Sequence, residues 1–131
     1  MHQPLSDPPI LIHPNAKHGY VLFNQGQYFD AHEELEIAWR AEKSPYRELY
    51  RGVLQVGVAY FHIQRGNYSG AKKMLERAAG WLEPFPDICL GINVNQLKID
   101  ALRTYTLLIE LGSERIHQFN PVYFRPLEMV S

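Results

Sequence analysis

A six-residue motif, G-x-Y-x-x-A, occurs twice, as 26–31 and again forty positions later as 66–71. Glycine typically ends one helix, and the tyrosine and alanine let the following helix pack closely, as in helical-hairpin repeats. The register continues beyond the motif in three further pairs: Leu35 and Leu75, Glu36 and Glu76, Ala38 and Ala78. Two copies predict two related hairpins, which can close into a bundle but are too few for a solenoid. The alternative is a common turn used twice by chance.

Prolines and glycines divide the rest of the chain into helices, and no segment predicts a convincing strand. The third helix is expected to start at Ser44-Pro45, with serine as N-cap and proline at the first helical position. The five predicted helices run from after Pro14 to near Asn24, from about Tyr28 to Ala41, from Ser44 to Arg65, from about Tyr68 to Leu82, and from near Asn93 to Gly112. The predicted fold is therefore all-α, a compact bundle of about five helices with two related hairpins.

The predicted domain, 15–112, lies between two proline-containing arms. Residues 1–14 read as an extended Pro-rich N-terminal arm, and 113–131 as an extended C-terminal tail that packs on the body or on a partner. With 131 residues, of which 46% are hydrophobic, the chain is long enough to bury the core of one domain. Residues 1–14 lack the apolar region of a signal peptide.

Charge and cysteine content exclude several classes of protein. The formal net charge of -1 argues against a charge-driven nucleic-acid binder or a protein that binds membrane surfaces through a basic patch. No segment is apolar over the length of a transmembrane helix. The single cysteine, Cys89, has no internal disulfide partner, which favours a reducing compartment and a cytoplasmic location.

Polar residues interrupt two apolar helix faces. At 100° per residue, His32 falls inside the apolar stripe of the second helix, beside Trp39, and Glu36 lies at the edge of that stripe. The third helix is apolar almost all round, yet Glu48, Gln55 and His62 interrupt it at heptad spacing. An unsatisfied buried polar group costs about 1–3 kcal/mol, so these residues need partners. We therefore expect His32 and Glu36 to face Gln55 and His62.

Two interpretations of this cluster remain open. In the first, His32, Glu36, Gln55 and His62 form a satisfied structural network that fixes helix register. In the second, His32, Glu36 and His62 hold a divalent metal such as zinc or iron, while Glu33 acts as general base and Gln55 as an orienting group. The H-E-x-x-E sequence lacks the second histidine of a zincin helix, and the paired E-x-x-H of di-iron bundles is missing. The structural network is therefore favoured, and no cofactor is the leading expectation.

A basic patch lies around the second predicted loop. It comprises Arg40, Lys43, Arg47 and Arg51. Glu42 and Glu48 interleave with these cations, which is typical of a solvated face rather than a phosphate site.

The order and spacing of these residues resemble a known family. The chain carries Phe23-Asn24-Gln25-Gly26-Gln27-Tyr28-Phe29-Asp30-Ala31-His32-Glu33, then Leu35-Glu36, Trp39-Arg40, Gly52, Leu54-Gln55, His62, Arg65-Gly66-Asn67 and Gly70-Ala71. From about Tyr20 to Leu111 it resembles a small helical family catalogued as domain-of-unknown-function family 309. The resemblance implies an all-helical bundle, a cytosolic setting and no established activity. The family signature centres on His32, Glu33, Glu36, Trp39, Gln55 and His62.

The leading hypothesis is a non-catalytic binding or scaffold module. Its groove would hold the polar cluster at the base, with Trp39 and Tyr60 as aromatic walls and a protein or small molecule as partner. The alternative is a metal-dependent or acid–base hydrolase that uses the same cluster. A third reading is a domain that only forms homo-oligomers, through an exposed apolar face on the fourth or fifth helix. The positions that would form this face are Leu97, Ala101, Tyr105 and Leu108.

Overall fold

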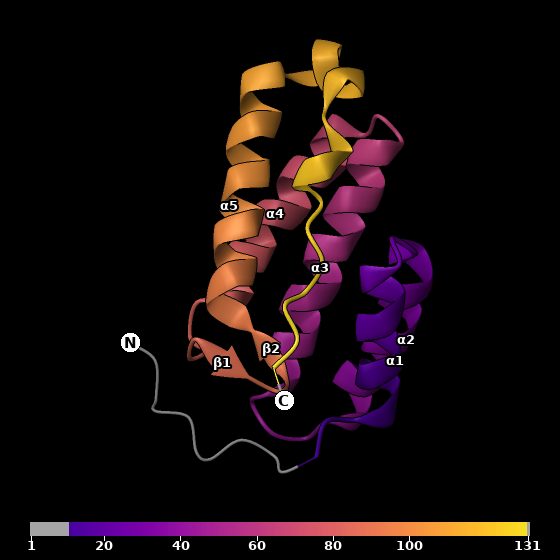
Figure 1. Ribbon diagram of the computed structural model, residues 1–131, viewed down its shortest axis with the longest axis vertical. Coiled ribbons are helices and arrows are strands. Elements are labelled where there is room, and N and C mark those ends of the chain that lie inside the picture. The colour runs from indigo at the N-terminus through magenta and orange to yellow at the C-terminus, as the bar shows by residue number, and fades with distance from the viewer. Residues whose placement is uncertain (1–10, 131) are drawn as a thin grey trace.

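The computed structural model describes residues 11–130 and shows a bundle of α-helices (Figure 1). The elements are α1 (Pro14–Asn24), α2 (Tyr28–Ala41), α3 (Arg47–Gln64), α4 (Tyr68–Leu82), β1 (Ile88–Cys89), β2 (Ile92–Asn93), α5 (Val94–Leu111), and the 3₁₀ turns η1 (Ser113–Gln118) and η2 (Pro121–Tyr123). The all-α prediction is confirmed. Most of the predicted N-terminal arm, residues 1–10, lies outside the described residues.

The two copies of the repeated motif form the same turn. Gly26 and Gly66 have φ angles of 77° and 74°, a left-handed conformation that glycine adopts without a steric penalty. In each turn the amide that follows the glycine donates to the carbonyl five residues back, at 2.9 Å in the first copy and 2.8 Å in the second. This hydrogen bond is typical of a Schellman ending. The motif therefore joins α1 to α2 and α3 to α4, as the repeat predicts.

The start of α3 differs from the prediction. Ser44 does not cap the helix, which begins at Arg47. Instead, the Ser44 hydroxyl accepts a hydrogen bond from the Tyr46 amide at 3.2 Å. The next three amides, from Arg47 to Leu49, each donate to the carbonyl three residues back. A tight turn of 3₁₀ type therefore precedes the α-helix and moves its start two residues beyond Pro45.

A small antiparallel hairpin, β1–β2, was not predicted. Its turn places Leu90 and Gly91 at φ angles of 48° and 82°, and two consecutive positive angles suit a tight two-residue hairpin turn. Strands of two residues carry no detectable alternation of polar and apolar residues, which explains why the prediction missed them. Ile92 also forms an isolated bridge with Met129, so the hairpin receives the end of the chain.

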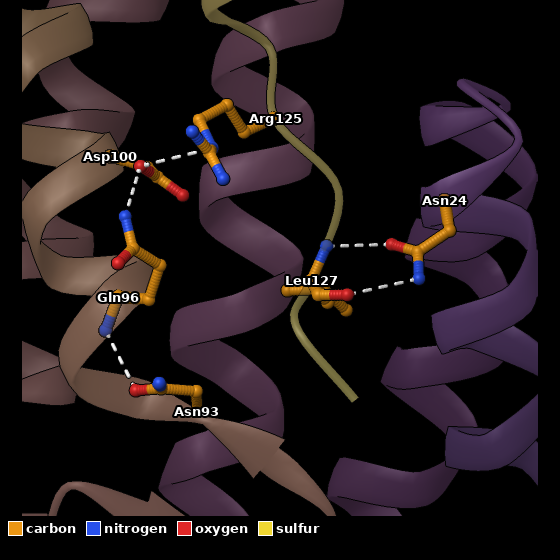
Figure 2. Close-up of polar contacts among 6 residues, drawn as sticks. All are labelled: Asn24, Asn93, Gln96, Asp100, Arg125 and Leu127. Carbon is orange, nitrogen blue, oxygen red and sulfur yellow. Dashed lines mark hydrogen bonds and ion pairs between the residues drawn. The ribbon is translucent and has the colours of Figure 1, made fainter. Parts of the chain in front are cut away.

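The C-terminal segment lies along one side of the bundle, in front of α3 and between α5 and α1 in Figure 1. The Asn24 side chain of α1 forms two hydrogen bonds with the backbone of Leu127 (Figure 2). Its Oδ1 accepts from the Leu127 amide at 2.7 Å, and its Nδ2 donates to the Leu127 carbonyl at 3.2 Å. The Leu127 side chain is 4% exposed. This segment therefore contributes to the core.

Two further contacts fix the same segment to α3 and α5. The Phe124 ring lies 4.8 Å, centroid to centroid, from the Tyr60 ring of α3. Arg125 faces the buried Asp100 carboxylate of α5, with 3.7 Å between Nε and Oδ1. Gln96 donates to the same carboxylate at 2.9 Å (Figure 2). The tail thus covers the face of the bundle that is formed by α1, α3 and α5 and lies in front in Figure 1.

The expected apolar face for oligomers is not exposed. Leu97, Ala101 and Leu108 are buried, and Tyr105 is half-buried, because this side of α5 packs into the core. The exposed apolar residues of α5 are instead Ile99, Leu102 and Ile109. Among residues 11–130, no helix combines the length and hydropathy needed to cross a membrane.

Candidate functional site

The predicted cluster begins on α2 with a histidine–carboxylate pair. His32 Nε2 lies 3.4 Å from Glu36 Oε2, one helical turn away, and Glu36 also forms an ion pair with Arg40. The other ring nitrogen of His32, Nδ1, is buried and has no hydrogen-bond partner. Glu33 points to solvent. The structure thus brings His32 and Glu36 together on α2, and Glu33 does not join them.

His62 lies at the end of α3 and has its own environment. Its Nδ1 is 3.3 Å from the Asn67 side-chain amide in the turn that follows. Partial burial, with a smaller contribution from the Arg65 charge, lowers the pKa of the His62 imidazole below its usual value. Within residues 11–130, no hydrogen bond or ion pair joins His62 or Gln55 to His32 or Glu36. The hydrogen bonds expected between these side chains of the two helices are therefore not formed.

The donor set does not fit a metal ion. Within the described chain, no three His, Cys, Asp or Glu side chains are grouped so that they could hold one. His32 and Glu36 supply two donors from a single helix, and His62 pairs with Asn67 instead. A zinc or iron site needs three or four converging donors.

The lowered pKa of His62 predicts a pH effect. A folded state that binds the proton more weakly than the unfolded state loses stability as the pH falls below about 6.5, toward the lowered pKa. We expect His62→Gln to lose less unfolding free energy than the wild type between pH 7.5 and pH 5. Urea unfolding at both pH values measures this. Equal losses in the two proteins would contradict the prediction.

Arginine and tryptophan side chains contact one another on this side of the bundle. The Arg51 guanidinium of α3 lies 4.1 Å from the centroid of the Trp81 ring in α4 and 5.1 Å from that of Trp39 in α2. Arg47 covers Trp39 as well, at 4.7 Å. Each such cation–π contact contributes about 0.5–2 kcal/mol, depending on its desolvation. Arg47 and Arg51 therefore connect α2, α3 and α4. Their local sequence pattern indicated a solvated face, which is not what the structure shows for these two residues.

A cleft of about 420 Å³ lies between α3 and α4, next to these arginine–tryptophan contacts. It is lined by Arg51, Gln55, Glu76, Arg77, Gly80 and Trp81. Gln55 is 8% exposed, and its Oε1 atom is buried without a hydrogen-bond partner. Arg51 and Tyr60 are nine residues apart on α3, which places them on roughly opposite sides of the helix. The cleft therefore lies away from the side that the tail covers.

Several buried side-chain atoms have no hydrogen-bond partner in the part of the chain that the structure describes. They include His32 Nδ1, Trp39 Nε1, Glu48 Oε2 and Gln55 Oε1, of which Glu48 Oε2 lies 3.5 Å from Arg51 in an ion pair. A satisfied structural network would pair these atoms with one another, because an unpaired buried polar group is costly. Apart from the His32–Glu36 pair, the residues that the sequence pattern identified are thus not bonded to one another, and of these side chains Gln55 alone is buried as a whole.

Sequence reasoning did not find the α4 wall of the cleft. Arg77 and Gly80 interrupt no apolar stripe, and Trp81 is typical of a core position. The only available signal was Gly80 itself, because a glycine inside a helix is destabilising and indicates a packing or functional reason.

The fold and the cleft together describe a small, mostly helical domain with an open cleft lined by charged, amide and aromatic side chains. Comparison with known families confirms the predicted resemblance: the family described as "Domain of unknown function (DUF309)" matches residues 16–74. This match covers His32, Glu33, Glu36, Trp39, Gln55 and His62 but ends within α4, before Glu76, and not at Leu111 as expected. The family description assigns no activity.

One curated relative has comparable sequence. It is an "Uncharacterized protein" of Aquifex aeolicus (strain VF5), which is 26% identical over 83 residues, or 63% of this chain. The matched region spans only 25% of that relative's length. No solved structure matches this chain significantly.

Proposed function

We propose that this protein is a non-catalytic binding module that holds a small ligand in the cleft between α3 and α4. The observation that supports the proposal is the Gln55 side chain, which lines that cleft and has a buried, unpartnered Oε1 atom. Rotation of the side-chain amide by half a turn exchanges Oε1 with Nε2, so that a ligand in the cleft that donates a hydrogen bond can satisfy the acceptor. A cytoplasmic location belongs to the same proposal, since the buried Cys89 is a free thiol.

Gly80 supports the same site. A Cβ atom added at this position would meet no heavy atom within 4 Å, so packing does not require glycine here. Glycine inside a helix costs roughly 0.5–1 kcal/mol relative to alanine. The chain thus accepts two local costs, an unpaired acceptor and a helical glycine, at neighbouring positions of one cleft. Proteins often carry such costs at functional sites.

The alternative hydrolase has weaker support. General acid–base catalysis needs groups that converge on one reacting atom. His32 and Glu36 pair along one helix, Glu33 is exposed, and His62 pairs with Asn67. Gln55, the expected orienting group, faces the α4 cleft instead. A binding role does not require these side chains to converge on one reacting atom.

The substitution Gln55→Met tests the proposal through stability. Methionine has a similar size and removes the unpaired acceptor, so we expect the unfolding free energy to stay equal or to rise by about 1 kcal/mol. Urea unfolding measures the change, with Gln64→Met at the exposed end of α3 as a matched control. A loss of more than about 1 kcal/mol would instead indicate a satisfied structural network and contradict the proposal.

The same pair of variants tests binding. A library of small organic acids, amines and zwitterions is screened by thermal shift, because a ligand that binds only the folded state raises Tm. We expect at least one compound to stabilise the wild type and Gln64→Met but not Gln55→Met. A library that stabilises all three proteins equally, or none, would argue against a ligand in this cleft.

A further inference from the structure

The walls of the cleft carry charges of both signs. Arg51 and Arg77 supply guanidinium groups, and Glu76 supplies a carboxylate. Arg77 is exposed and forms no ion pair with the residues that the structure describes. A guanidinium binds a carboxylate through two parallel hydrogen bonds, which makes Arg77 a suitable partner for a ligand carboxylate.

The acceptors of the cleft suit an ammonium group. Gln55 Oε1 has no partner and no accessible surface, and the half-turn of the side-chain amide described above brings this acceptor to the cleft. Both partners of Glu76 contact its Oε2 atom: the Tyr105 hydroxyl at 2.7 Å and the Lys72 ammonium at 3.4 Å. The other oxygen, Oε1, is left for a ligand. The Tyr105 hydrogen bond lowers the pKa of the Glu76 carboxyl, so the group stays ionised at neutral pH. An ammonium carries three N–H donors and can reach both acceptors.

The remaining wall is apolar. The half-buried Trp81 ring has Arg51 above one face, and Trp81 lines the cleft. Beside it, Gly80 contributes no side chain and leaves open space. The volume of about 420 Å³ falls within the range of roughly 300–1,000 Å³ that is usual for small-molecule sites.

From this combination we infer that the ligand is a zwitterionic α-amino acid with an apolar side chain. Arg77, assisted by Arg51, binds its carboxylate, Gln55 and Glu76 accept from its ammonium, and its side chain packs against Trp81. A simple anion would leave the two acceptors without donors, and a simple cation would face two guanidinium groups. The inference rests on the proposed function and names its ligand class.

Three matched probes test each pole of the ligand. L-phenylalanine carries both charges, 3-phenylpropionate lacks the ammonium, and 2-phenylethylamine lacks the carboxylate. Isothermal titration calorimetry on the full chain at pH 7.5 is expected to show that both analogues bind at least tenfold more weakly than phenylalanine. L-leucine and L-methionine extend the series to aliphatic side chains. The inference is overturned if 3-phenylpropionate binds as tightly as phenylalanine, or if none of the three amino acids binds.

Two variants test where the amino acid binds. Gly80→Leu fills the cleft without meeting a neighbour at Cβ, so we expect an unchanged or higher Tm and loss of phenylalanine binding. Arg77→Gln should weaken phenylalanine binding at least tenfold and should not weaken 2-phenylethylamine binding, because the substitution removes a positive charge from the cleft. Lys17→Gln, which removes an exposed charge on α1, is the matched control. Unchanged phenylalanine binding in Gly80→Leu would overturn the assignment to this cleft.

These outcomes separate the inference from the proposed function. If the amino-acid probes fail while Gln55→Met remains stable and abolishes the thermal shift of another compound, the cleft binds a ligand of a different class. If Gln55→Met loses stability instead, Gln55 has a structural role and both proposals fail.

Discussion

The substitution Gly52→Val is expected to lower the unfolding free energy by about 3 kcal/mol, the upper part of the range for overpacked cores. Gly52 of α3 faces Leu82 and Trp81 of α4. A Cβ atom added there would lie 2.6 Å from Leu82 Cδ2 and 2.9 Å from Leu82 Cγ. Leu82 is fully buried, and both atoms that the new Cβ would meet belong to its side chain, so this side chain has to leave its present position in the core. The clash therefore outweighs the gain of up to about 1 kcal/mol from replacing a helical glycine.

Urea unfolding measures this effect against Gly80→Ala, in which the new Cβ meets nothing within 4 Å. The control is expected to gain up to about 1 kcal/mol, so the two glycine substitutions have opposite signs. A double-mutant cycle with Leu82→Ala isolates the contact: the cost of the pair should be smaller than the sum of the single costs. A Gly52→Val variant as stable as the wild type would contradict the tight packing of Gly52 against Leu82.

The substitution Leu127→Ala is expected to cost about 2–4 kcal/mol, as for other buried leucines. Its side chain is 4% exposed, although it belongs to an irregular segment near the C-terminus. Truncation leaves a cavity, because the Asn24 side chain holds the Leu127 backbone in place through hydrogen bonds to both its amide and its carbonyl. For a domain of this size the loss corresponds to a decrease in Tm of roughly 10 °C.

Met129→Ala provides the matched control. Met129 follows two residues later in the same segment and is 53% exposed, so its truncation should change stability by less than about 0.5 kcal/mol. Thermal unfolding by circular dichroism measures both variants. Similar Tm values for the two would show that the tail is not part of the cooperative unit and would contradict its role in the core.

The helices could be predicted from the sequence because their ends depend on local chemistry. Gly26 and Gly66 adopt positive φ angles that few other residues tolerate, and Pro14 occupies the first position of α1. These signals act within a few residues, so a single sequence is sufficient to read them. The start of α3 was misplaced because serine before proline can also form the tight turn that is observed.

The candidate site was predicted only in part. Periodicity singled out Gln55 and His62 as polar residues on a helix that is otherwise almost entirely apolar. It did not predict which residues lie next to them. Which residue faces Gln55 depends on how α4 crosses α3, and that crossing depends on Gly52 and Leu82. Arg51 illustrates the same limit. Its local pattern is that of a solvated face, yet two tryptophans from separate helices enclose it.

The sequence by itself determined the helices, their repeated turn and the face of α2 that is buried, since all three follow from backbone conformation and helical periodicity. Only the tertiary structure decided that the tail completes the core through Asn24 and that Gln55 opens into a cleft with Arg77. These contacts join residues that are distant in the chain. Their formation depends on side-chain volume and helix crossing, which no local pattern encodes.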